Sequence, residues 1–591
     1  MSVFFLFFFA FVIVGARAVQ LHLGDNQRLQ TLSERQYKRR IVVSPKRGSL
    51  LDRHGETLAM DLKVDSLYAA PHRIEDPQTL AKKLKNILNI SEKTLFNKLN
   101  QSDKKFVWIK RRLSQEESVA IQKLEEPGLG FLPEHKRFYP NSSLASNLLG
   151  AVGYDAQALA GLELSLDNYL KSTTPPLLVE KDARGRTYGA YALIGQENPQ
   201  QVVLTLDKHL QYLAERELKK GVEKAKAKRG MALVVEVASG DILAMASYPS
   251  FDPNHYSKYP IETWQNLNIS YSFEPGSTFK AITASAALES GVIKEGEKIN
   301  CENGKLKIGK DTINDHHGYA LLNLQEIIKH SSNIGSFKLA QRLGKARFLS
   351  FIQAFGFGHK SGLEIPGENP GLVASTKTMG DLQLGTIGFG QGISTTPLQI
   401  AMAYSALANG GKLMKPRLIK EIQDSEGKTI KKIPPEVRRQ VVQAKVAKTV
   451  IEALSQVVQE GGTGTQAALE AYQVTGKTGT AQKVLEGQRG YAKDKYIASF
   501  VGLAPAEDPK LVVLVSIDEP KGAYYGGLVS APVFKEIMGQ ALAYLQVPTS
   551  LGQEAFQVVS LDLKEKQKIE DKKQKTKNIN NKISPMKETS P

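Results

Sequence analysis

The sequence predicts an α+β protein in which an antiparallel sheet is covered by helices. Two apolar strand pairs support this prediction: residues 231–237 and 241–247 flank a turn at Ala238-Ser239-Gly240, and residues 499–506 and 510–519 form a second pair. The segments between the pairs are rich in helix-like apolar spacing, so strands lie at both ends of one domain around a helical middle. A chain of 591 residues, 41% of them hydrophobic, is long enough for two domains with buried cores.

The amino terminus predicts a single membrane anchor over residues 1–23. Residues 2–16 are uncharged and strongly apolar, and with Arg17 tolerated the stretch approaches the roughly 20 residues that a membrane helix needs. A cleaved signal peptide is the alternative, because residues 15–18 resemble a small-residue cleavage site, although the usual basic residues before the apolar run are missing. Positive charge follows the run instead. We attribute this order to a start codon assigned too late, and large domains also cross membranes largely regardless of charge.

Composition divides the remaining chain into three parts. Residues 24–198 are expected to form a pedestal of mixed strands and helices, including a helical stretch from about Pro77 to Leu99. The polar segment 195–201 indicates a linker, after which a larger domain, residues 199–548, begins with a strand and an amphipathic helix. The lysine-rich tail, residues 549–591, cannot support a core and is expected to be disordered.

Several functional classes are disfavoured by composition. The net charge of +18 is dispersed apart from residues 38–47 and the tail, so nucleic-acid binding is not indicated; a solvated tail or one that contacts anionic lipid remains open. The single cysteine, Cys301, excludes an intramolecular disulfide. His316-His317 beside Asp315 lack the spacing that places metal ligands on one face, so we predict no metal site. No phosphate-binding or dinucleotide-binding motif is present, and we predict no cofactor.

Three short motifs in one order indicate a serine acyl-transfer site. They are Ser277-Thr-Phe-Lys280, Ser331-Ser332-Asn333 and Lys477-Thr478-Gly479-Thr480. The Ser-x-x-Lys spacing also occurs at Ser102, Ser425 and Ser584. Only Ser277 follows a Pro-Gly turn and opens a run with helical apolar spacing, so only there does the pattern predict a rigidly mounted nucleophile.

The residue types explain the chemistry of the first two motifs. A serine hydroxyl needs a neighbouring base at neutral pH, and Lys280, three residues along a helix, can reach Ser277. A desolvated, electropositive pocket lowers the pKa of Lys280 so that it can accept a proton, and Lys477 can supply the positive field. Ser331 can pass protons to a leaving amine, and Asn333 can bind a substrate amide through its donor and acceptor.

The third motif is expected to lie on a β-strand. Gly476 and Gly479 carry no side chain, so we expect a substrate backbone to lie alongside the strand. The backbone N–H groups of Thr480 and Ser277 can form an oxyanion hole.

These motifs and longer segments resemble the class B penicillin-binding proteins, the monofunctional peptidoglycan transpeptidases, from about residue 41 to about residue 545. Residues 47–59, 137–150 and 160–170 are similar to elements of that family's amino-terminal module, and residues 238–254, 355–368, 388–411 and 461–465 to segments of its catalytic module. The resemblance implies the penicillin-binding transpeptidase fold behind a pedestal. It also implies roles for the motif residues: Ser277 as acylated nucleophile, Lys280 as general base, Ser331 and Asn333 as the second motif, and Lys477, Thr478 and Thr480 as the strand that recognises a carboxylate.

The function that the resemblance implies is crosslinking of peptidoglycan stem peptides. Ser277 attacks the carbonyl between two terminal D-alanines, D-alanine leaves, and an amine of a neighbouring stem resolves the acyl-enzyme; β-lactams acylate the same serine. The enzyme would sit in the bacterial cytoplasmic membrane as a single-pass protein with its catalytic domain outside the cytoplasm.

The branch of the family and the partners are also implied by the resemblance. The compact amino-terminal module and Gly461–Thr465 favour the division-septum branch, and a separate glycosyltransferase and division proteins are the expected partners. A D,D-carboxypeptidase and a non-catalytic scaffold of the division machinery are the alternatives.

Overall fold

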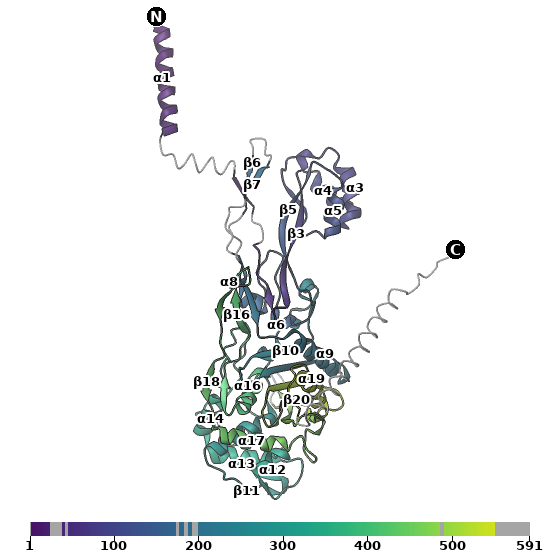
Figure 1. The fold of residues 1–591 in the computed structure, drawn as a ribbon, viewed down its shortest axis with the longest axis vertical. Coiled ribbons are helices and arrows are strands. Elements are labelled where there is room, and N and C mark those ends of the chain that lie inside the picture. The colour runs from purple at the N-terminus through teal and green to yellow at the C-terminus, as the bar shows by residue number, and fades with distance from the viewer. Residues whose placement is uncertain are drawn as a thin grey trace, which may run out of the picture. The chain divides into compact units, whose positions relative to one another are not determined.

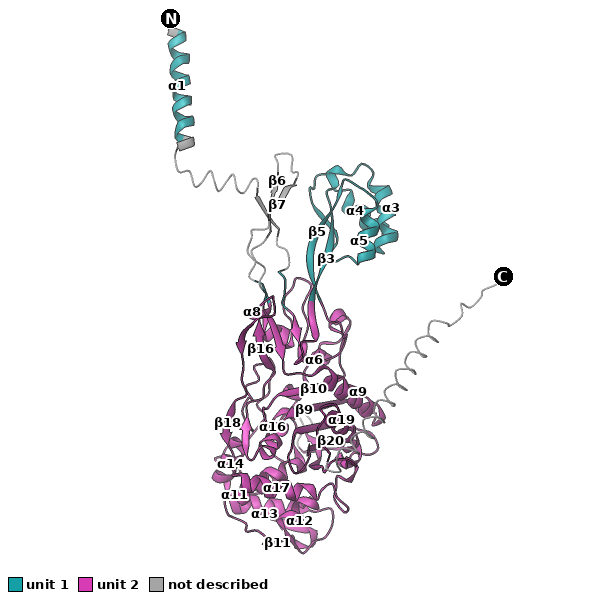
Figure 2. Ribbon diagram, viewed as in Figure 1, with its two compact units in different colours: residues 1–48, 61–137, 171–199 teal, residues 49–60, 138–170, 200–591 magenta. Residues whose placement is uncertain are grey.

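The structure is a computed structural model that describes residues 2–23, 38–41, 45–172, 177–181, 187–191, 199–484 and 490–549 (Figure 1). The predicted tail from residue 550 onward lies outside the described residues, as does most of the predicted linker. The chain divides into two compact units (Figure 2): unit 1 is residues 1–48, 61–137 and 171–199, and unit 2 is residues 49–60, 138–170 and 200–591. Unit 1 thus ends near the expected boundary at residue 198, but two segments that we assigned to the pedestal, 49–60 and 138–170, belong to unit 2.

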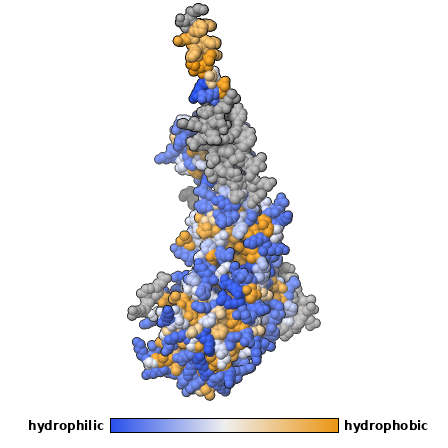
Figure 3. All heavy atoms as spheres, turned by 90° about the vertical axis from the view of Figure 1, so that its left-hand side faces the viewer, coloured by the Kyte–Doolittle hydropathy of each residue, from blue (hydrophilic) through white to orange (hydrophobic). Residues whose placement is uncertain are grey.

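Helix α1 (Ser2–Leu23) begins unit 1 and is compatible with a single-pass membrane anchor. Its residues from Val3 to Gln20 are long and apolar enough to cross a membrane, and none of them is buried against protein. Figure 3 shows this helix as a column of hydrophobic side chains. Such a surface is unfavourable in water and favourable in hydrocarbon, which agrees with the predicted anchor.

The folded part of unit 1 packs helices on a small antiparallel sheet. Its elements are the end of β3 (Thr57–Ala69), α3 (Pro77–Leu88), α4 (Glu92–Leu99), β4 (Val107–Lys110), α5 (Gln115–Gln122) and β5 (Leu129–Phe138). Leucines of α3 and α4 form its core. The predicted helical stretch is two helices rather than one, because Asn89 adopts a left-handed conformation with φ of 54° and Ser91 caps α4. Three further strands, β1 (Lys38–Ile41), β6 (Leu177–Lys181) and β7 (Thr187–Tyr191), pair antiparallel.

A five-stranded antiparallel sheet forms the centre of unit 2. Its order is β10 (Ile242–Tyr248), β9 (Arg229–Glu236), β21 (Leu511–Asp518), β20 (Tyr491–Ala504) and β19 (Thr475–Val484). Both predicted strand pairs are confirmed, and they join where β9 pairs with β21. β20 begins well before its predicted start at residue 499, because its first half pairs with the extended end of β19.

Helices cover both faces of this sheet, as Figure 1 shows for α9 (Lys208–Lys224) and α19 (Ala531–Tyr544) on one side. Val234 of β9 shares a hydrophobic core with Phe534 of α19, whereas its neighbour Leu233 belongs to the core on the other face, together with Tyr404. Alternate residues of β9 therefore enter different cores. This double burial explains why the strands are apolar throughout instead of alternating apolar and polar residues.

The helical middle of unit 2 contributes to the core that contains Leu233 and Tyr404. Its elements are η4 (Gly276–Phe279), α11 (Lys280–Glu289), β13 (Asp311–Asn314), α12 (Leu324–Lys329), α13 (Asn333–Leu343), α14 (Lys345–Ala354), α15 (Asp381–Ile387), α16 (Pro397–Ala408) and α17 (Ala444–Ser455). A side sheet joins β17 (Thr429–Lys432), β16 (Ile419–Gln423), β8 (Gln201–Leu204) and β2 (Leu50–Leu51).

The two reassigned segments have a physical reason to lie in unit 2. β2 pairs parallel with β8, and helices α6 (Ser146–Leu149), α7 (Gly161–Ser165) and α8 (Asp167–Leu170) place Leu148, Leu162 and Leu170 in the main core of unit 2. Their apolar side chains are buried by the larger domain.

Candidate active site

Ser277 lies in a turn whose backbone is tightly held. It belongs to η4, which leads directly into the buried helix α11. Gly276 has a φ of +55°, and a Cβ at Gly390 would lie 2.1 Å from the Gly276 carbonyl oxygen, so the two turns approach each other too closely for side chains. The Thr278 carbonyl accepts a hydrogen bond from the buried Tyr404 hydroxyl at 2.7 Å. The predicted nucleophile therefore has little freedom to move.

Lys280 is 1% exposed and contacts the hydroxyl of Ser277. Its Nζ lies 3.1 Å from Ser277 Oγ, and it also donates to Ser331 Oγ at 3.1 Å, to the Ser331 carbonyl oxygen and to Asn333 Oδ1 at 2.8 Å. Burial holds the pKa of Lys280 well below its usual value, and the neighbouring charge of Lys477 lowers it further. The lowered pKa favours the neutral amine, which is the form that can accept a proton from Ser277.

Two buried lysines meet at one hydroxyl, that of Ser331. Lys477 is 0% exposed and donates to Ser331 Oγ at 3.0 Å, beside the bond from Lys280. Burial lowers the pKa of Lys477 to about 7. Ser331 has a backbone φ of 58°, an uncommon conformation for a residue with a side chain and one that often marks functional sites. A proton can pass between the two amines through this hydroxyl.

The third motif lies on β19, the edge strand of the central sheet. The Thr478 hydroxyl is 2.8 Å from that of Thr463, a residue of the 461–465 segment. Thr480 Oγ1 accepts from the Gly526 backbone N–H at 3.1 Å. Both threonine hydroxyls are therefore oriented by neighbours on other elements.

Gly476 and Gly479 also have a packing role that the sequence did not predict. A Cβ at this position would lie 2.9 Å from the Thr278 methyl carbon and 3.1 Å from the Pro275 carbonyl oxygen. At Gly476, a Cβ would meet the Val501 carbonyl oxygen at 2.6 Å. The glycines thus allow β19 to approach the nucleophile turn and its partner strand.

Asp315 is a site residue that the sequence analysis missed. Its carboxylate accepts from the Ser332 hydroxyl at 2.6 Å, from the Ile334 backbone N–H at 3.1 Å and from the Asn333 backbone N–H. A carboxylate at the first turn of α13 satisfies free N–H groups and complements the helix dipole. Asp315 therefore fixes the second motif, and its neighbour His316 packs against the Tyr525 ring at 6.1 Å.

All three predicted motifs come together in unit 2. Hydrogen bonds join Ser277, Lys280, Ser331, Asn333 and Lys477, and Thr478, Gly479 and Thr480 continue the adjacent strand. Among the described residues, the other Ser-x-x-Lys pairs show no such contact: Ser102 and Ser425 lie in turns and neither bonds the lysine three residues on. Ser584 lies outside the described residues.

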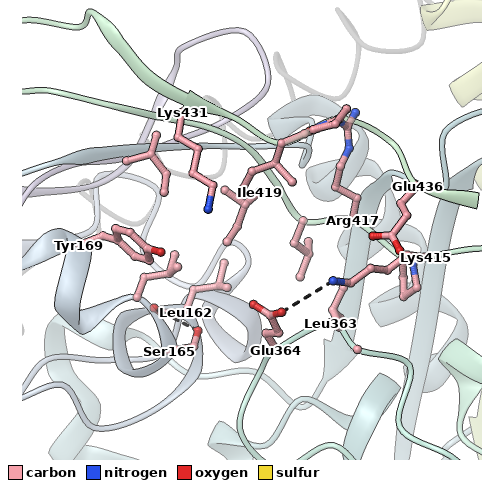
Figure 4. A pocket seen from close by; sticks show the side chains of 17 residues that line it. Leu162, Ser165, Tyr169, Leu363, Glu364, Lys415, Arg417, Ile419, Lys431 and Glu436 are labelled. Carbon is pink, nitrogen blue, oxygen red and sulfur yellow. Dashed lines mark hydrogen bonds and ion pairs between the residues drawn. The ribbon is translucent and has the colours of Figure 1, made fainter. Parts of the chain in front are cut away.

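A separate cavity of unit 2 lies away from these motifs (Figure 4). It has a volume of about 180 Å³ and is lined by Leu162, Tyr169, Ile419 and Lys431, among others. Lys415 pairs with Glu364 at its edge at 3.7 Å. No residue of the three motifs lines it. Its lining shows no nucleophile beside a base, so it is not the candidate active site.

Comparisons with known proteins agree with this geometry. The family model described as the penicillin binding protein transpeptidase domain matches residues 230–539, and the one described as the penicillin-binding protein dimerisation domain matches residues 42–204. Stage V sporulation protein D of Bacillus subtilis is 34% identical over 546 residues, covering 91% of this chain and 84% of the relative. Peptidoglycan D,D-transpeptidase FtsI of Escherichia coli K12 is 34% identical over 512 residues, covering 85% of this chain and 84% of the relative.

A solved structure supports the same fold. Penicillin binding protein 3 of Mycobacterium tuberculosis, in complex with aztreonam, superposes with a TM-score of 0.66 at 27% identity. The match covers 86% of this chain and 98% of that one. The arrangement of sheet and helices is therefore shared with a protein that binds a β-lactam.

The contacts of Asp315 predict a stability effect. Asp315→Ala removes every hydrogen bond that the carboxylate accepts at the start of α13, so we expect it to destabilise the protein by roughly 2 kcal/mol or more. Asp311→Ala is the matched control, because Asp311 is exposed and its side chain makes no hydrogen bond or ion pair in the described chain. Thermal unfolding followed by circular dichroism measures both variants. Equal unfolding temperatures would contradict the role given to Asp315.

Proposed function

Since this chain belongs to the class B penicillin-binding proteins, we propose that Ser277 is the nucleophile with which it crosslinks peptidoglycan as a D,D-transpeptidase. The observation that carries the assignment is the contact between Ser277 and Lys280. A buried amine of lowered pKa lies 3.1 Å from the serine hydroxyl, which is hydrogen-bond reach for a general base.

Acylation in this proposal begins with proton transfer from Ser277 to neutral Lys280. Ser277 Oγ forms a bond to the carbonyl carbon between the two terminal D-alanines of a stem peptide. The backbone N–H groups of Ser277 and Thr480 stabilise the oxyanion that develops. The proton then passes from Lys280 through Ser331 to the departing nitrogen, the C–N bond breaks, and D-alanine leaves with its amine protonated.

Deacylation reverses these roles with a new nucleophile. An amine of a neighbouring stem peptide attacks the ester carbonyl and gives its proton, through Ser331, to Lys280. The C–O bond breaks, and Ser277 recovers the proton as the new peptide bond forms. Two contacts fix the Asn333 side chain: its Oδ1 accepts from Lys280, and its Nδ2 donates to the Asn314 carbonyl oxygen at 2.8 Å. An amide oxygen can accept a second hydrogen bond and an amide nitrogen can donate a second one, so Asn333 can also bind the substrate amide.

The terminal carboxylate of the donor stem is bound by the third motif. Lys477 offers positive charge, and the Thr478 and Thr480 hydroxyls offer donors at fixed positions. A charge-assisted hydrogen bond of this kind contributes roughly 1.5 to 3 kcal/mol. β19 is also an edge strand, so an extended stem peptide can lie along its free side.

Membrane attachment by α1 would keep this chemistry at its substrate. The apolar helix is compatible with a single span, and we propose that unit 2 lies outside the cytoplasm, where peptidoglycan is assembled. The relatives include the FtsI transpeptidase of Escherichia coli, and this similarity supports a role in septal synthesis. Division proteins and a separate glycosyltransferase are the partners that such a role requires.

The alternative functions are less well supported. In a D,D-carboxypeptidase water would replace the acceptor amine, and the relatives named as transpeptidases favour the transfer reaction instead. A scaffold with no catalytic role has no need for a buried lysine in contact with a serine hydroxyl. Incubation with a pentapeptide glycan separates the first two functions, because dimers report transfer and trimmed monomers report hydrolysis.

The nucleophile is tested by covalent labelling. Ser277→Ala is expected to abolish labelling by fluorescent penicillin, because the attacking oxygen is gone. Lys280→Ala is expected to slow it by roughly 10² to 10⁴-fold, since the base is lost. Ser102→Ala and Ser425→Ala, the matched controls, should label at the wild-type rate. Intact-mass analysis reads the result, and undiminished acylation of Ser277→Ala would refute the assignment.

The two lysines predict a bell-shaped pH profile for acylation by penicillin. The rate constant should rise as Lys280 loses its proton, since only the neutral amine is a base. It should fall above about pH 7, because Lys477, with a pKa of about 7, then loses the charge that binds the carboxylate. The two apparent pKa values of the profile belong to Lys280 and Lys477 as a coupled pair, because both amines share Ser331. Measuring the second-order constant from about pH 5 to about pH 10 tests this; a steady rise through alkaline pH would contradict the role of Lys477.

The need for a separate polymerase gives a fourth prediction. The family models that match are a dimerisation domain and a transpeptidase domain, so we expect the purified chain to leave lipid-linked disaccharide-pentapeptide unpolymerised. Added glycosyltransferase should give crosslinked product that depends on Ser277. Gel analysis of the glycan strands, with Ser277→Ala as control, provides the measurement. Glycan polymer made by this protein alone would refute the prediction.

A further inference from the structure

Glu274, three residues before Ser277, is a partly buried carboxylate that the mechanism does not use. Its Oε1 accepts from the Gly392 backbone N–H at 2.8 Å and from the Tyr491 hydroxyl at 3.2 Å. Its Oε2 is buried without a hydrogen-bond partner, and burial raises the pKa of the group. A carboxylate with one unsatisfied oxygen lowers stability, so its presence beside the nucleophile needs another explanation.

The Glu274 side chain joins a segment that the backbone does not reach. Main-chain hydrogen bonds already fasten the nucleophile turn to residues 390–395: Gly276 N–H donates to the Gly390 carbonyl at 3.1 Å, and Phe273 exchanges bonds of 3.0 and 2.8 Å with Thr395. The bond from Glu274 to Gly392 adds to this attachment. The bond with Tyr491 does something different, because it connects the turn to the first residue of β20.

Tyr491 belongs to the ribbon of β19 and β20, whose inner part, with the third motif, is also paired with β21. It lies opposite Val484 of β19, while Thr480 lies opposite Ala498 further along the same ribbon. The ribbon therefore meets the nucleophile segment at two places: at Gly479, which packs against the turn, and at Tyr491, which bonds Glu274. The ribbon is also attached to β21, by strand pairing and by the ion pairs of Lys483 with Asp518 and Glu519. The bond of Tyr491 adds a direct attachment between the outer end of the ribbon and the nucleophile segment.

Glu274 is not among the charged neighbours that shift the pKa of Lys280. The charged neighbours that shift the pKa of Lys280 are Lys477 and Asp315, and burial is the main cause for both lysines. What the geometry of Glu274 offers is a fixed connection between two elements that must lie close together for the chemistry.

We propose that Glu274 and Tyr491 are positioning residues, whose hydrogen bond holds the strand carrying Lys477 to Thr480 in the geometry that acylation of Ser277 requires. This inference rests on the proposed role of Ser277. Loss of the bond slows the chemical step, because the carboxylate-binding groups no longer stay aligned with the nucleophile. It leaves the fraction of active enzyme and the shape of the pH profile unchanged, since neither lysine is altered.

The experiment measures acylation of the full-length, detergent-solubilised chain by fluorescent penicillin, resolved into the binding constant K and the acylation rate constant k2. Tyr491→Phe is expected to lower k2 by about ten-fold, with one label per chain at completion. Glu274→Ala should do the same or more. The double variant should be no slower than Glu274→Ala, because both changes remove the same bond. Glu274→Gln, which keeps an acceptor oxygen for both donors, should retain more activity than Glu274→Ala.

A matched control lies on the same strand. Within the part of the chain that the structure describes, the Tyr496 hydroxyl donates only to the Lys493 carbonyl oxygen, at 3.4 Å, so Tyr496→Phe should keep the wild-type k2. An unchanged k2 in Tyr491→Phe would overturn the inference. So would a double variant whose loss in k2 equals the product of the losses in the two single variants. A loss confined to the labelled fraction would overturn it too, since that result indicates misfolding. Labelling that persists in Ser277→Ala would instead refute the proposed function. The k2 of Tyr491→Phe could still be compared with that of the wild type.

Discussion

The site depends on one constraint: two lysines, Lys280 and Lys477, are buried together around the hydroxyl of Ser331. Their partners are hydroxyl, carbonyl and amide oxygens rather than carboxylates, so neither ammonium is neutralised by an ion pair. Removing a charged amine from water is unfavourable by several kcal/mol. The protein responds by lowering both pKa values, and a lysine that gives up its proton near neutral pH is what a serine nucleophile needs. The burial that opposes folding is thus the source of the reactivity.

Burial of the Lys280 and Lys477 amines requires that the backbones of neighbouring elements approach each other closely. This close approach explains the glycines around the site. Side chains at Gly390, Gly479 and Gly526 would each meet a backbone or side-chain atom at 2.9 Å or less. Each of these glycines lets one element pack directly on the next. Asp315 and Glu274 then fasten these elements together through hydrogen bonds, one at the start of α13 and one between the nucleophile turn and β20. The close packing at the glycines and the hydrogen bonds of Asp315 and Glu274 therefore both hold the elements of the site together.

The sequence predicted what is encoded locally. Apolar runs predicted the four strands of the two pairs, and the three motifs identified the residues that the structure brings together. The sequence did not predict the contacts of Asp315 and Glu274, because their partners are distant in sequence and no pattern in the adjacent residues indicates them. Residues 49–60 and 138–170 lie in the predicted pedestal and within the matched dimerisation domain, yet they pack in compact unit 2. An apolar pattern shows that a segment is buried, but not which core buries it.

The order of elements along the chain adds a last consequence. β9 and β10 precede Ser277, whereas β19, β20 and β21 follow the whole helical middle, and the pairing of β9 with β21 is what joins them. Lys477 therefore reaches Ser331 only when the sheet is complete. In the unfolded chain both lysines are hydrated and have the high pKa of a free amine, so Lys280 is protonated and cannot act as a base. The reactive serine is a property of the closed domain rather than of any one motif, and this is why residues 200 positions apart in sequence must be positioned by the same fold.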